Sequence, residues 1–156
     1  MAKFRGDLHV ELPSRTGDVV WVKMNLRVTR GTILVVEDEP RLRFIVHKQL
    51  ESAGFDVVSE ESGEAALRTL GTLTPDLVLL NIQLLPGMDG VQVCEWIRAD
   101  RRLGHIPVIF LTVLADSESR TRCVRAGAND YVTKPWDSPD LVLRIGNAIA
   151  VSRSQR

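Results

Sequence analysis

The sequence is poor in the features that mark exported, membrane-spanning and disulfide-stabilised proteins. It has two cysteines among 156 residues, Cys94 and Cys123, and their spacing matches no metal-binding motif. Both fall in segments with a helical pattern, so we expect buried thiols and a reducing compartment. No apolar run is long enough to cross a bilayer, and the start of the chain lacks the apolar core of a secretory signal. These absences predict a soluble, cytoplasmic protein.

The sequence also lacks a net charge. Twenty Lys and Arg residues balance twenty Asp and Glu residues, so the formal charge at pH 7 is zero. A chain without excess positive charge is not expected to bind nucleic acid or a membrane surface mainly by electrostatics. We therefore expect neither nucleic acid nor a membrane among its partners. Apolar residues make up 44% of the chain, which is enough for the core of one domain with a small appendage.

Residues 1–31 differ in pattern from the rest of the chain. Two stretches, residues 8–12 and 20–28, alternate apolar and polar side chains on either side of a loop that contains Gly17. Such alternation around a short loop predicts a β-hairpin. A hairpin alone is only marginally stable in water, so its apolar face must cover another surface. That surface is the following domain, a second copy of the chain, or a domain outside this sequence.

From Thr32 onward, short apolar runs alternate with amphipathic stretches. Strands are predicted over 32–36, 56–59, 76–81, 107–112 and 131–133, and helices over 40–53, 63–70, 89–99, 116–126 and 138–151. Five strand–helix units predict an α/β fold with a doubly wound, five-stranded parallel sheet in the flavodoxin-like order 2-1-3-4-5. We expect residues 32–151 to form this domain and residues 152–156 to be a polar tail.

Polar residues stand where four of these strands end. Glu37 and Asp38 follow the first strand, and Asn81 follows the third. Thr112 ends the fourth strand, and Lys134 follows the fifth. Ligands of open α/β sheets bind beyond the carboxyl ends of the strands, so we expect these side chains to form one site.

The motifs VVEDEP, LVLLN…LPGMDG, IFLT and AGANDYVTKPW occur in this order. Together they resemble the receiver domain of bacterial two-component response regulators over residues 32–151. The resemblance implies a signalling module in which an Asp after the third strand accepts a phosphoryl group from a histidine kinase. In the hairpin, TGDVVWVKMNLRV resembles the closing strands of a PAS sensory domain. Residues 1–31 are thus either the end of a PAS domain or a dimerisation arm.

The resemblance also assigns roles to single residues. In the family an acidic pair and a backbone carbonyl bind Mg²⁺, a hydroxyl and a lysine contact the phosphoryl oxygens, and an aromatic residue turns inward with the hydroxyl. The lysine precedes a cis-proline. These roles fall on Glu37, Asp38 and the backbone carbonyl of Gln83 for Mg²⁺, and on Thr112, Tyr131, Lys134 and Pro135 for phosphoryl contact and switching.

The sequence departs from the family at the phosphoacceptor position. Counted from the end of the strand, this position falls on Asn81, and counted back from Pro86 it falls on Ile82. The two counts differ because four residues separate Asn81 from Pro86, whereas the family usually has three residues between the acceptor and the proline. Neither residue has a carboxylate. An amide cannot form an acyl phosphate, so we predict a receiver that is not phosphorylated in the usual way. It is expected to be no enzyme and to act through protein–protein interaction.

The same substitution affects the metal. Two carboxylates about 4 Å apart repel by roughly 4 kcal/mol at an effective dielectric constant near 20. Asn81 relieves part of this repulsion and removes one anionic ligand, so we expect weakened Mg²⁺ binding. Expected partners are a histidine kinase or another signalling protein. A homodimer is expected to form either through the hairpin or through the face formed by residues 116–126, 131–133 and 138–151.

Two other functions remain open. The first is a conventional phosphoryl-accepting regulator that uses another acid, Asp38 or Asp89. The second is a flavodoxin-like nucleotide or flavin binder, which needs a phosphate loop rich in Ser, Thr or Gly after the first strand. Glu37 to Pro40 occupy that loop here, and their negative charges repel phosphate.

Overall fold

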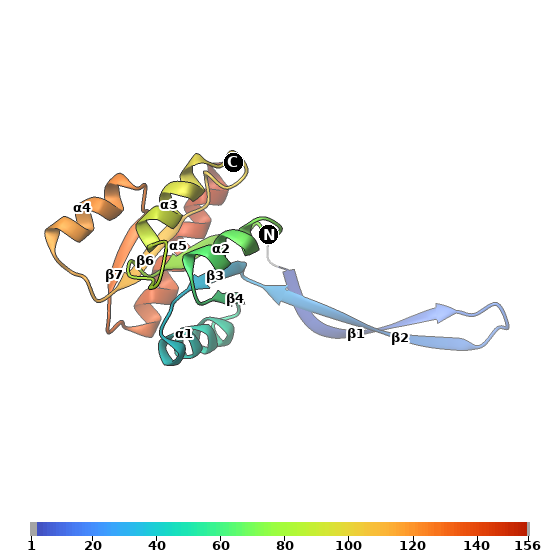
Figure 1. Cartoon of the computed structure of the whole chain (residues 1–156). Coiled ribbons are helices and arrows are strands. Elements are labelled where there is room, and N and C mark those ends of the chain that lie inside the picture. The colour runs from blue at the N-terminus through green and yellow to red at the C-terminus, as the bar shows by residue number, and fades with distance from the viewer. Residues whose placement is uncertain (1–2, 156) are drawn as a thin grey trace.

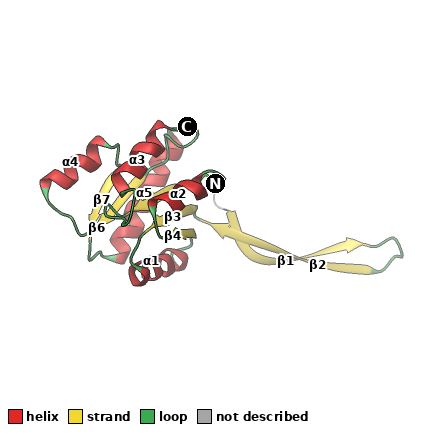
Figure 2. Cartoon of the chain, viewed as in Figure 1, coloured by secondary structure: helices red, strands yellow, loops and turns green. Residues whose placement is uncertain are grey.

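The chain folds into a layered α/β domain from which a two-stranded arm projects (Figures 1 and 2). The structure is a computed structural model that describes the backbone of residues 3–155 and the side chains of residues 9–23 and 28–155. The elements are β1 (Lys3–Pro13), β2 (Val19–Thr29), β3 (Thr32–Val36), α1 (Pro40–Ser52), β4 (Asp56–Glu60), α2 (Gly63–Leu70), β5 (Leu77–Leu80), α3 (Gly90–Ala99), β6 (Val108–Thr112), α4 (Ser117–Arg125), β7 (Asp130–Thr133) and α5 (Ser138–Ser154).

The domain is built on a five-stranded parallel sheet with the order β4-β3-β5-β6-β7. Counted within the domain, this order is 2-1-3-4-5, so the predicted α/β class and flavodoxin-like topology are confirmed. The four residues of β5 are all buried, as expected for a central strand that is covered on both faces. The register pairs Val36 with Leu80, which brings the carboxyl ends of β3 and β5 to the same level.

Helices cover both faces of the sheet (Figure 1). On one face, α1 and α5 bring Leu50 and Ile145 into a core with alternate residues of the strands. On the other face, α2, α3 and α4 bring Leu70, Ile97 and Cys123 into a second core. Successive strand residues point to opposite faces, so each strand contributes to both cores. Packing on both sides fixes the positions of the strand ends.

The arm, residues 3–29, is an antiparallel ribbon of β1 and β2. The register pairs Val10 with Val22 and Leu12 with Val20. Directly paired residues of an antiparallel ribbon point to the same face, so these apolar side chains lie together. The hairpin that the alternation predicted is therefore confirmed.

The apolar face of the arm is exposed. In Figure 1 the arm points away from the sheet. Leu12 is 46% exposed and Val20 is 45% exposed on the apolar face, and Trp21 is 64% exposed on the opposite face. Leu8, Met24 and Leu26, which the alternation also assigned to the apolar face, lie outside the residues whose side chains are described.

Helix α5 is longer than predicted. The pattern indicated an end near Val151, but the helix continues to Ser154. In its last turn, the Arg153 guanidinium lies 3.4 Å from a carboxylate oxygen of Asp76, which is an ion pair the sequence pattern did not indicate. Most of the predicted polar tail is thus helical. The division of the chain into an appendage, a receiver and a tail stays a prediction.

Two expectations from the sequence concern the burial of the cysteines and the absence of a membrane-spanning helix. Cys94 and Cys123 are both free and buried, as predicted. Within residues 3–155, no helix combines the length and the apolar character that a bilayer span requires.

Candidate functional site

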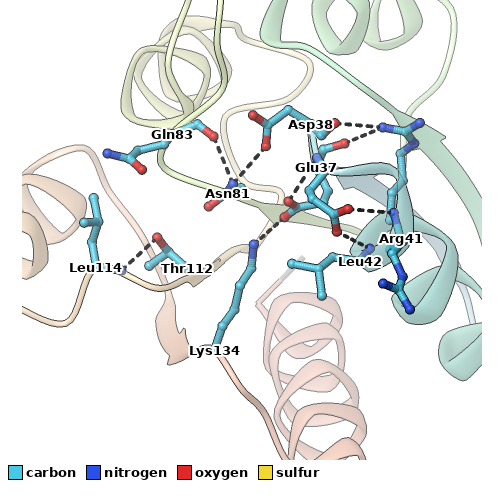
Figure 3. Close-up of polar contacts among 11 residues, drawn as sticks. Glu37, Asp38, Arg41, Leu42, Asn81, Gln83, Thr112, Leu114 and Lys134 are labelled. Carbon is cyan, nitrogen blue, oxygen red and sulfur yellow. Dashed lines mark hydrogen bonds and ion pairs between the residues drawn. The ribbon is translucent and has the colours of Figure 1, made fainter.

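The carboxyl ends of β3, β5, β6 and β7 meet at one edge of the sheet, which we call the mouth (Figure 3). This edge brings together Glu37, Asp38, Asn81, Thr112 and Lys134. Two backbone hydrogen bonds fix the strand ends: the Asn81 N–H donates to the Val36 carbonyl at 3.0 Å, and the Lys134 N–H donates to the Thr112 carbonyl at 2.8 Å. The predicted convergence of these five residues is therefore present, and their roles stay predictions.

Lys134 and Glu37 form a buried ion pair in the mouth. The Lys134 Nζ lies 2.7 Å from Oε2 of Glu37, and the two side chains are only 8% and 5% exposed. The other carboxylate oxygen of Glu37 accepts a hydrogen bond from the Glu39 N–H at 3.3 Å. Burial raises the pKa of Glu37 above its ordinary value, and the hydrogen bond and charge of Lys134 oppose that rise. Lys134 is thus engaged with Glu37.

The side-chain amide of Asn81 lies between two oxygens (Figure 3). Its Nδ2 donates to the backbone carbonyl of Gln83 at 2.9 Å and to Oδ1 of Asp38 at 3.3 Å. An amide NH₂ group has two hydrogens, and both have an acceptor here. Asn81 is 7% exposed, so this polar group is buried but hydrogen-bonded.

The loop after β5 decides which residue faces the mouth. Asn81 faces it, whereas Ile82 and Leu84 are 2% and 1% exposed and pack into the core beneath α2 and α3. Leu85 is 75% exposed, and its peptide bond to Pro86 is cis. Of the two positions that counting allowed for the acceptor, the one whose side chain reaches the other site residues is Asn81.

Gly90 lies directly against the backbone of Asn81. Gly90 is the first residue of α3, and its N–H donates to the Ile82 carbonyl at 2.7 Å. A Cβ at this position would overlap the carbonyl oxygen of Asn81 and would lie 3.1 Å from Cα of Ile82. Only glycine therefore lets the start of α3 approach the end of β5 this closely.

Thr112 and Tyr131 occupy different surroundings. Thr112 is fully buried at the mouth, and its Oγ1 accepts a hydrogen bond from the Leu114 N–H at 3.3 Å. Tyr131 packs against the core on the α4 side, with the Arg120 guanidinium 5.3 Å from its ring. Its hydroxyl is buried and has no hydrogen-bond partner among the described residues. Tyr131 is thus placed away from the polar residues of the mouth. At the mouth itself, the peptide bond between Lys134 and Pro135 is cis, as the resemblance implied.

Two residues of the site were not singled out from the sequence. Nη1 of Arg43 donates to the backbone carbonyls of Glu37 at 2.9 Å and Asp38 at 3.4 Å, so it holds the acidic loop. Glu39 caps α1, and its carboxylate accepts from backbone N–H groups of the first turn. An acidic residue before Pro40 is a sequence signal for a helix start that identifies Glu39. No comparable signal separates Arg43 from an ordinary surface arginine.

Asp89, an acid considered as an alternative acceptor, lies outside the mouth. It is the N-cap of α3 and forms a capping box with Gln92. Its Oδ1 accepts from the Gln92 N–H at 2.9 Å, and its Oδ2 lies 3.0 Å from Nη2 of Arg122 on α4. One carboxylate oxygen of Asp89 therefore caps the start of α3, and the other pairs with Arg122 on α4.

The oxygens at the mouth are of the type that Mg²⁺ prefers. They are the carboxylates of Glu37 and Asp38 and the backbone carbonyl of Gln83, all hard ligands. Each of them accepts a hydrogen bond from Lys134 or Asn81. In the part of the chain that is described, no group of three His, Cys, Asp or Glu side chains is arranged to hold a metal. The type of ligand therefore fits Mg²⁺, but the side chains of Lys134 and Asn81 compete with the ion for these oxygens.

The sequence of the domain identifies its family. Residues 33–146 match the response regulator receiver domain, so the chain belongs to that family. Receiver domains bind Mg²⁺ for phosphorylation. The chain is 41% identical over 113 residues to the phosphate regulon transcriptional regulatory protein PhoB of Escherichia coli, covering 72% of this chain and 49% of PhoB. It is 40% identical over 116 residues to the DNA-binding response regulator MtrA of Mycolicibacterium smegmatis, covering 74% and 49%.

Solved structures show the same fold. The receiver domain of a signal transduction histidine kinase from Syntrophus aciditrophicus superposes with a TM-score of 0.73 at 33% identity, covering 78% of this chain and 91% of that one. A putative response regulator from Chloroflexus aurantiacus gives a TM-score of 0.74 at 32% identity, covering 77% and 98%. Family membership does not test the effect of Asn81 or the PAS resemblance of the arm, and both stay predictions.

One expectation about partners is wrong. The balanced charge of the chain led us to exclude nucleic acid, but a relative that is 40% identical is a DNA-binding response regulator. The chain spans about half the length of the sequence relatives it matches. The net charge of a receiver domain says nothing about binding surfaces elsewhere in such regulators, so it cannot exclude nucleic acid as a partner.

Proposed function

We propose that this chain is a signalling receiver that is not phosphorylated in the usual way. In this proposal it works as a binding module through contacts with other proteins and is not an enzyme. The phosphoacceptor position is Asn81, whose amide nitrogen is not nucleophilic and cannot carry a stable acyl phosphate. Control then comes from what the domain binds rather than from a phosphoryl group.

The observation that carries the proposal is the environment of the Asn81 amide. Its Nδ2 donates to the Gln83 carbonyl and to Asp38, which are two of the oxygens that the family uses for Mg²⁺. Nitrogen donors thus stand where a cation and a carboxylate nucleophile are needed. This supports a site that is complete in its hydrogen bonding but lacks the reacting group.

The ion pair of Lys134 adds to this picture. In a phosphorylated receiver the lysine contacts the phosphoryl oxygens, and here its Nζ lies 2.7 Å from Glu37. Breaking a buried ion pair leaves an uncompensated charge and costs several kcal/mol. A phosphoryl group at the mouth would have to draw Lys134 away from this partner.

The alternative acceptors receive less support. Asp89 is bound by the start of α3 and by Arg122, away from Lys134 and Thr112. Asp38 lies at the mouth, but it follows β3 and accepts a hydrogen bond from Asn81. No contact among the described residues favours a nucleotide or flavin, so that alternative is not carried further.

Mg²⁺ binding is proposed to be weakened rather than lost. Glu37, Asp38 and the Gln83 carbonyl would hold the ion, which supplies charge neutralisation for phosphoryl chemistry when bound. Asn81 contributes a neutral group in place of an anionic ligand, and Lys134 already neutralises Glu37. Both changes lower the negative charge that attracts a cation to the mouth.

We also propose that the output of this receiver reaches nucleic acid, directly or through the proteins it contacts. The support is that MtrA, a DNA-binding response regulator, is 40% identical to this chain over 116 residues. This proposal concerns the output and does not depend on the state of Asn81.

Incubation of the chain with acetyl phosphate and Mg²⁺, followed by intact-mass measurement, tests the proposed silence of the acceptor position. We expect no phosphoryl adduct. A base-labile adduct would contradict the proposal, and mapping of the modified peptide would then show whether Asp38 or Asp89 had accepted the group.

A further inference from the structure

Arg30 joins the arm to the domain through three contacts with one turn. Its backbone N–H donates to the Gly54 carbonyl at 2.9 Å, and its Nη1 donates to the Ala53 carbonyl at 3.3 Å. Its guanidinium stacks on the ring of Phe55 at 4.6 Å, and Phe55 is almost fully buried. A guanidinium over an aromatic face is attracted electrostatically as well as packed. Arg30 is therefore fixed against the turn between α1 and β4.

Helix α5 leaves space for the same guanidinium. Gly146 lies in the middle of this 17-residue helix, and a Cβ there would lie 2.9 Å from Nη2 of Arg30. Glycine in a helix interior costs about 1 kcal/mol relative to alanine. Gly54 also leaves room for Arg30, since a Cβ there would lie 3.3 Å from its Cδ. The Arg30 side chain thus lies between a glycine of the α1–β4 turn and a glycine of α5.

The residues on either side of Arg30 are also held. Thr29, at the end of the exposed arm, is only 8% exposed. Its Oγ1 donates to the Gly31 carbonyl at 2.9 Å and accepts from the Asp56 N–H at 3.2 Å. The Asp56 N–H also donates to the Gly31 carbonyl at 2.9 Å. The connection between arm and domain is thus hydrogen-bonded on both sides of Arg30, although Gly31, with a φ of 145°, gives it one residue of unusual backbone freedom.

We propose that Arg30 is a latch that fixes the direction of the arm relative to α5 and to the α1–β4 turn. While Arg30 is seated against Phe55 and Gly146, the arm and the domain move as one body. When it leaves, the arm pivots about Arg30 and Gly31. A partner that grips the arm is then either held at a fixed orientation to α5 or released from it.

Through Arg30, the latch also ties the foot of the arm to the helix that follows the mouth. α5 begins at Ser138, shortly after Lys134 and Pro135, and it runs past Gly146 to the opposite edge of the sheet (Figure 1). One helix therefore begins four residues after Lys134 and lies against Arg30 at Gly146. This inference does not rest on the proposed silence of Asn81.

Distances between spin labels test the latch directly. One label is attached at Arg15→Cys, in the exposed turn of the arm, and one at Arg101→Cys, in the exposed loop after α3. The native thiols of Cys94 and Cys123 are buried, and burial raises the pKa of each to about 11, so they stay unlabelled. We expect a single narrow distance distribution in the otherwise unchanged chain.

Two variants should release the arm. Arg30→Ala removes the stacking and the side-chain hydrogen bond, and we expect the width of the distribution to at least double. Gly146→Ala should broaden it as well, although alanine normally favours a helix, because the methyl group displaces the guanidinium. Asn147→Ala is the matched control, since it changes the adjacent, exposed position of α5 and should leave the width unchanged.

The outcomes separate the parts of the proposal. A broad distribution in the unchanged chain would overturn it, as would an unchanged width in Arg30→Ala. Broadening in Arg30→Ala but not in Gly146→Ala would overturn the role of α5. Circular dichroism and thermal unfolding of each variant verify that the domain is folded when the distances are measured. Phosphorylation assays on the same samples would be unaffected, so failure here is distinguishable from failure of the proposed function.

Discussion

Asn81 shows what one side chain changes at a strand end. A carboxylate at its position would face the carboxylates of Glu37 and Asp38, and such charges repel by several kcal/mol at these separations. The amide has almost the same shape but donates to Asp38 and to the Gln83 carbonyl. The mouth is therefore held in part by hydrogen bonds that the Asn81 amide donates.

Replacement of Gly90 should disturb this arrangement through the backbone. In Gly90→Ala the methyl group would overlap the carbonyl oxygen of Asn81, so the start of α3 or the end of β5 must shift. Overpacking of this kind costs about 3 kcal/mol. Urea unfolding of the variant should show a loss of this size.

Gly17→Ala provides the control for that loss. Gly17 has a positive φ of 87°, but nothing lies within 4 Å of a Cβ built there. Its replacement should cost only about 1 kcal/mol of backbone strain, and this cost falls on the arm. Equal losses in the two variants would mean that steric contact with Asn81 is not what requires glycine at position 90.

The two buried thiols predict a pH dependence at the alkaline end. Burial raises the pKa of Cys94 and of Cys123 from 9.0 to about 11. Between these values the unfolded chain loses thiol protons that the folded chain retains, so stability should fall as the pH rises from 9 towards 11. Urea unfolding at pH 8, 9 and 10 measures this slope. The double variant Cys94→Ala/Cys123→Ala should have a smaller slope, and an identical slope would contradict the assignment.

At the scale of elements, helices α3 and α4 begin at acidic N-cap residues, which can be identified from their place in the sequence. The side chain of Asp116, the first residue of the predicted helix 116–126, accepts from the Ser119 N–H and caps the start of α4. Asp89 does the same for α3 and also pairs with Arg122. Caps are local, so sequence spacing is enough to find them. The pairing of Asp89 with α4 depends on packing and was not predictable.

Separate variants of Asp89 distinguish its cap from its ion pair. Asp89→Ala removes both and should destabilise the domain by about 1 kcal/mol. Asp89→Asn keeps a good N-cap and loses only a partly exposed ion pair, so its loss should be a few tenths of a kcal/mol. Urea unfolding compares them, and equal losses would show that the contact with Arg122 matters more than the cap.

At the scale of the whole molecule, the fold was predictable and the contacts of the site were only partly so. Alternation of strands and helices, with apolar strands such as β5, fixes a parallel sheet whose strand ends must converge. The convergence of Glu37, Asp38, Asn81 and Lys134 followed from that topology. The pairing of Lys134 with Glu37 did not, because it depends on side-chain conformations that only packing decides.

The arm marks the limit of reading a single sequence. Its alternation predicted a hairpin and an apolar face, but the direction of the arm depends on how Arg30 seats against Phe55 and Gly146. These residues are far apart in the sequence and carry no shared pattern. The exclusion of nucleic acid as a partner also failed because it used a property of the whole chain. A net charge of zero does not show how charge is distributed over separate surfaces.

The most direct test of the central claim compares the unchanged chain with Asn81→Asp. Both are incubated with acetyl phosphate and Mg²⁺, and the intact masses are measured before and after treatment with base. We predict that only Asn81→Asp gains a base-labile phosphoryl group. The reason is that the other predicted site residues already lie at the mouth, and the acceptor carboxylate is the group that the substitution adds. Phosphorylation of the unchanged chain, or of neither chain, would contradict this claim.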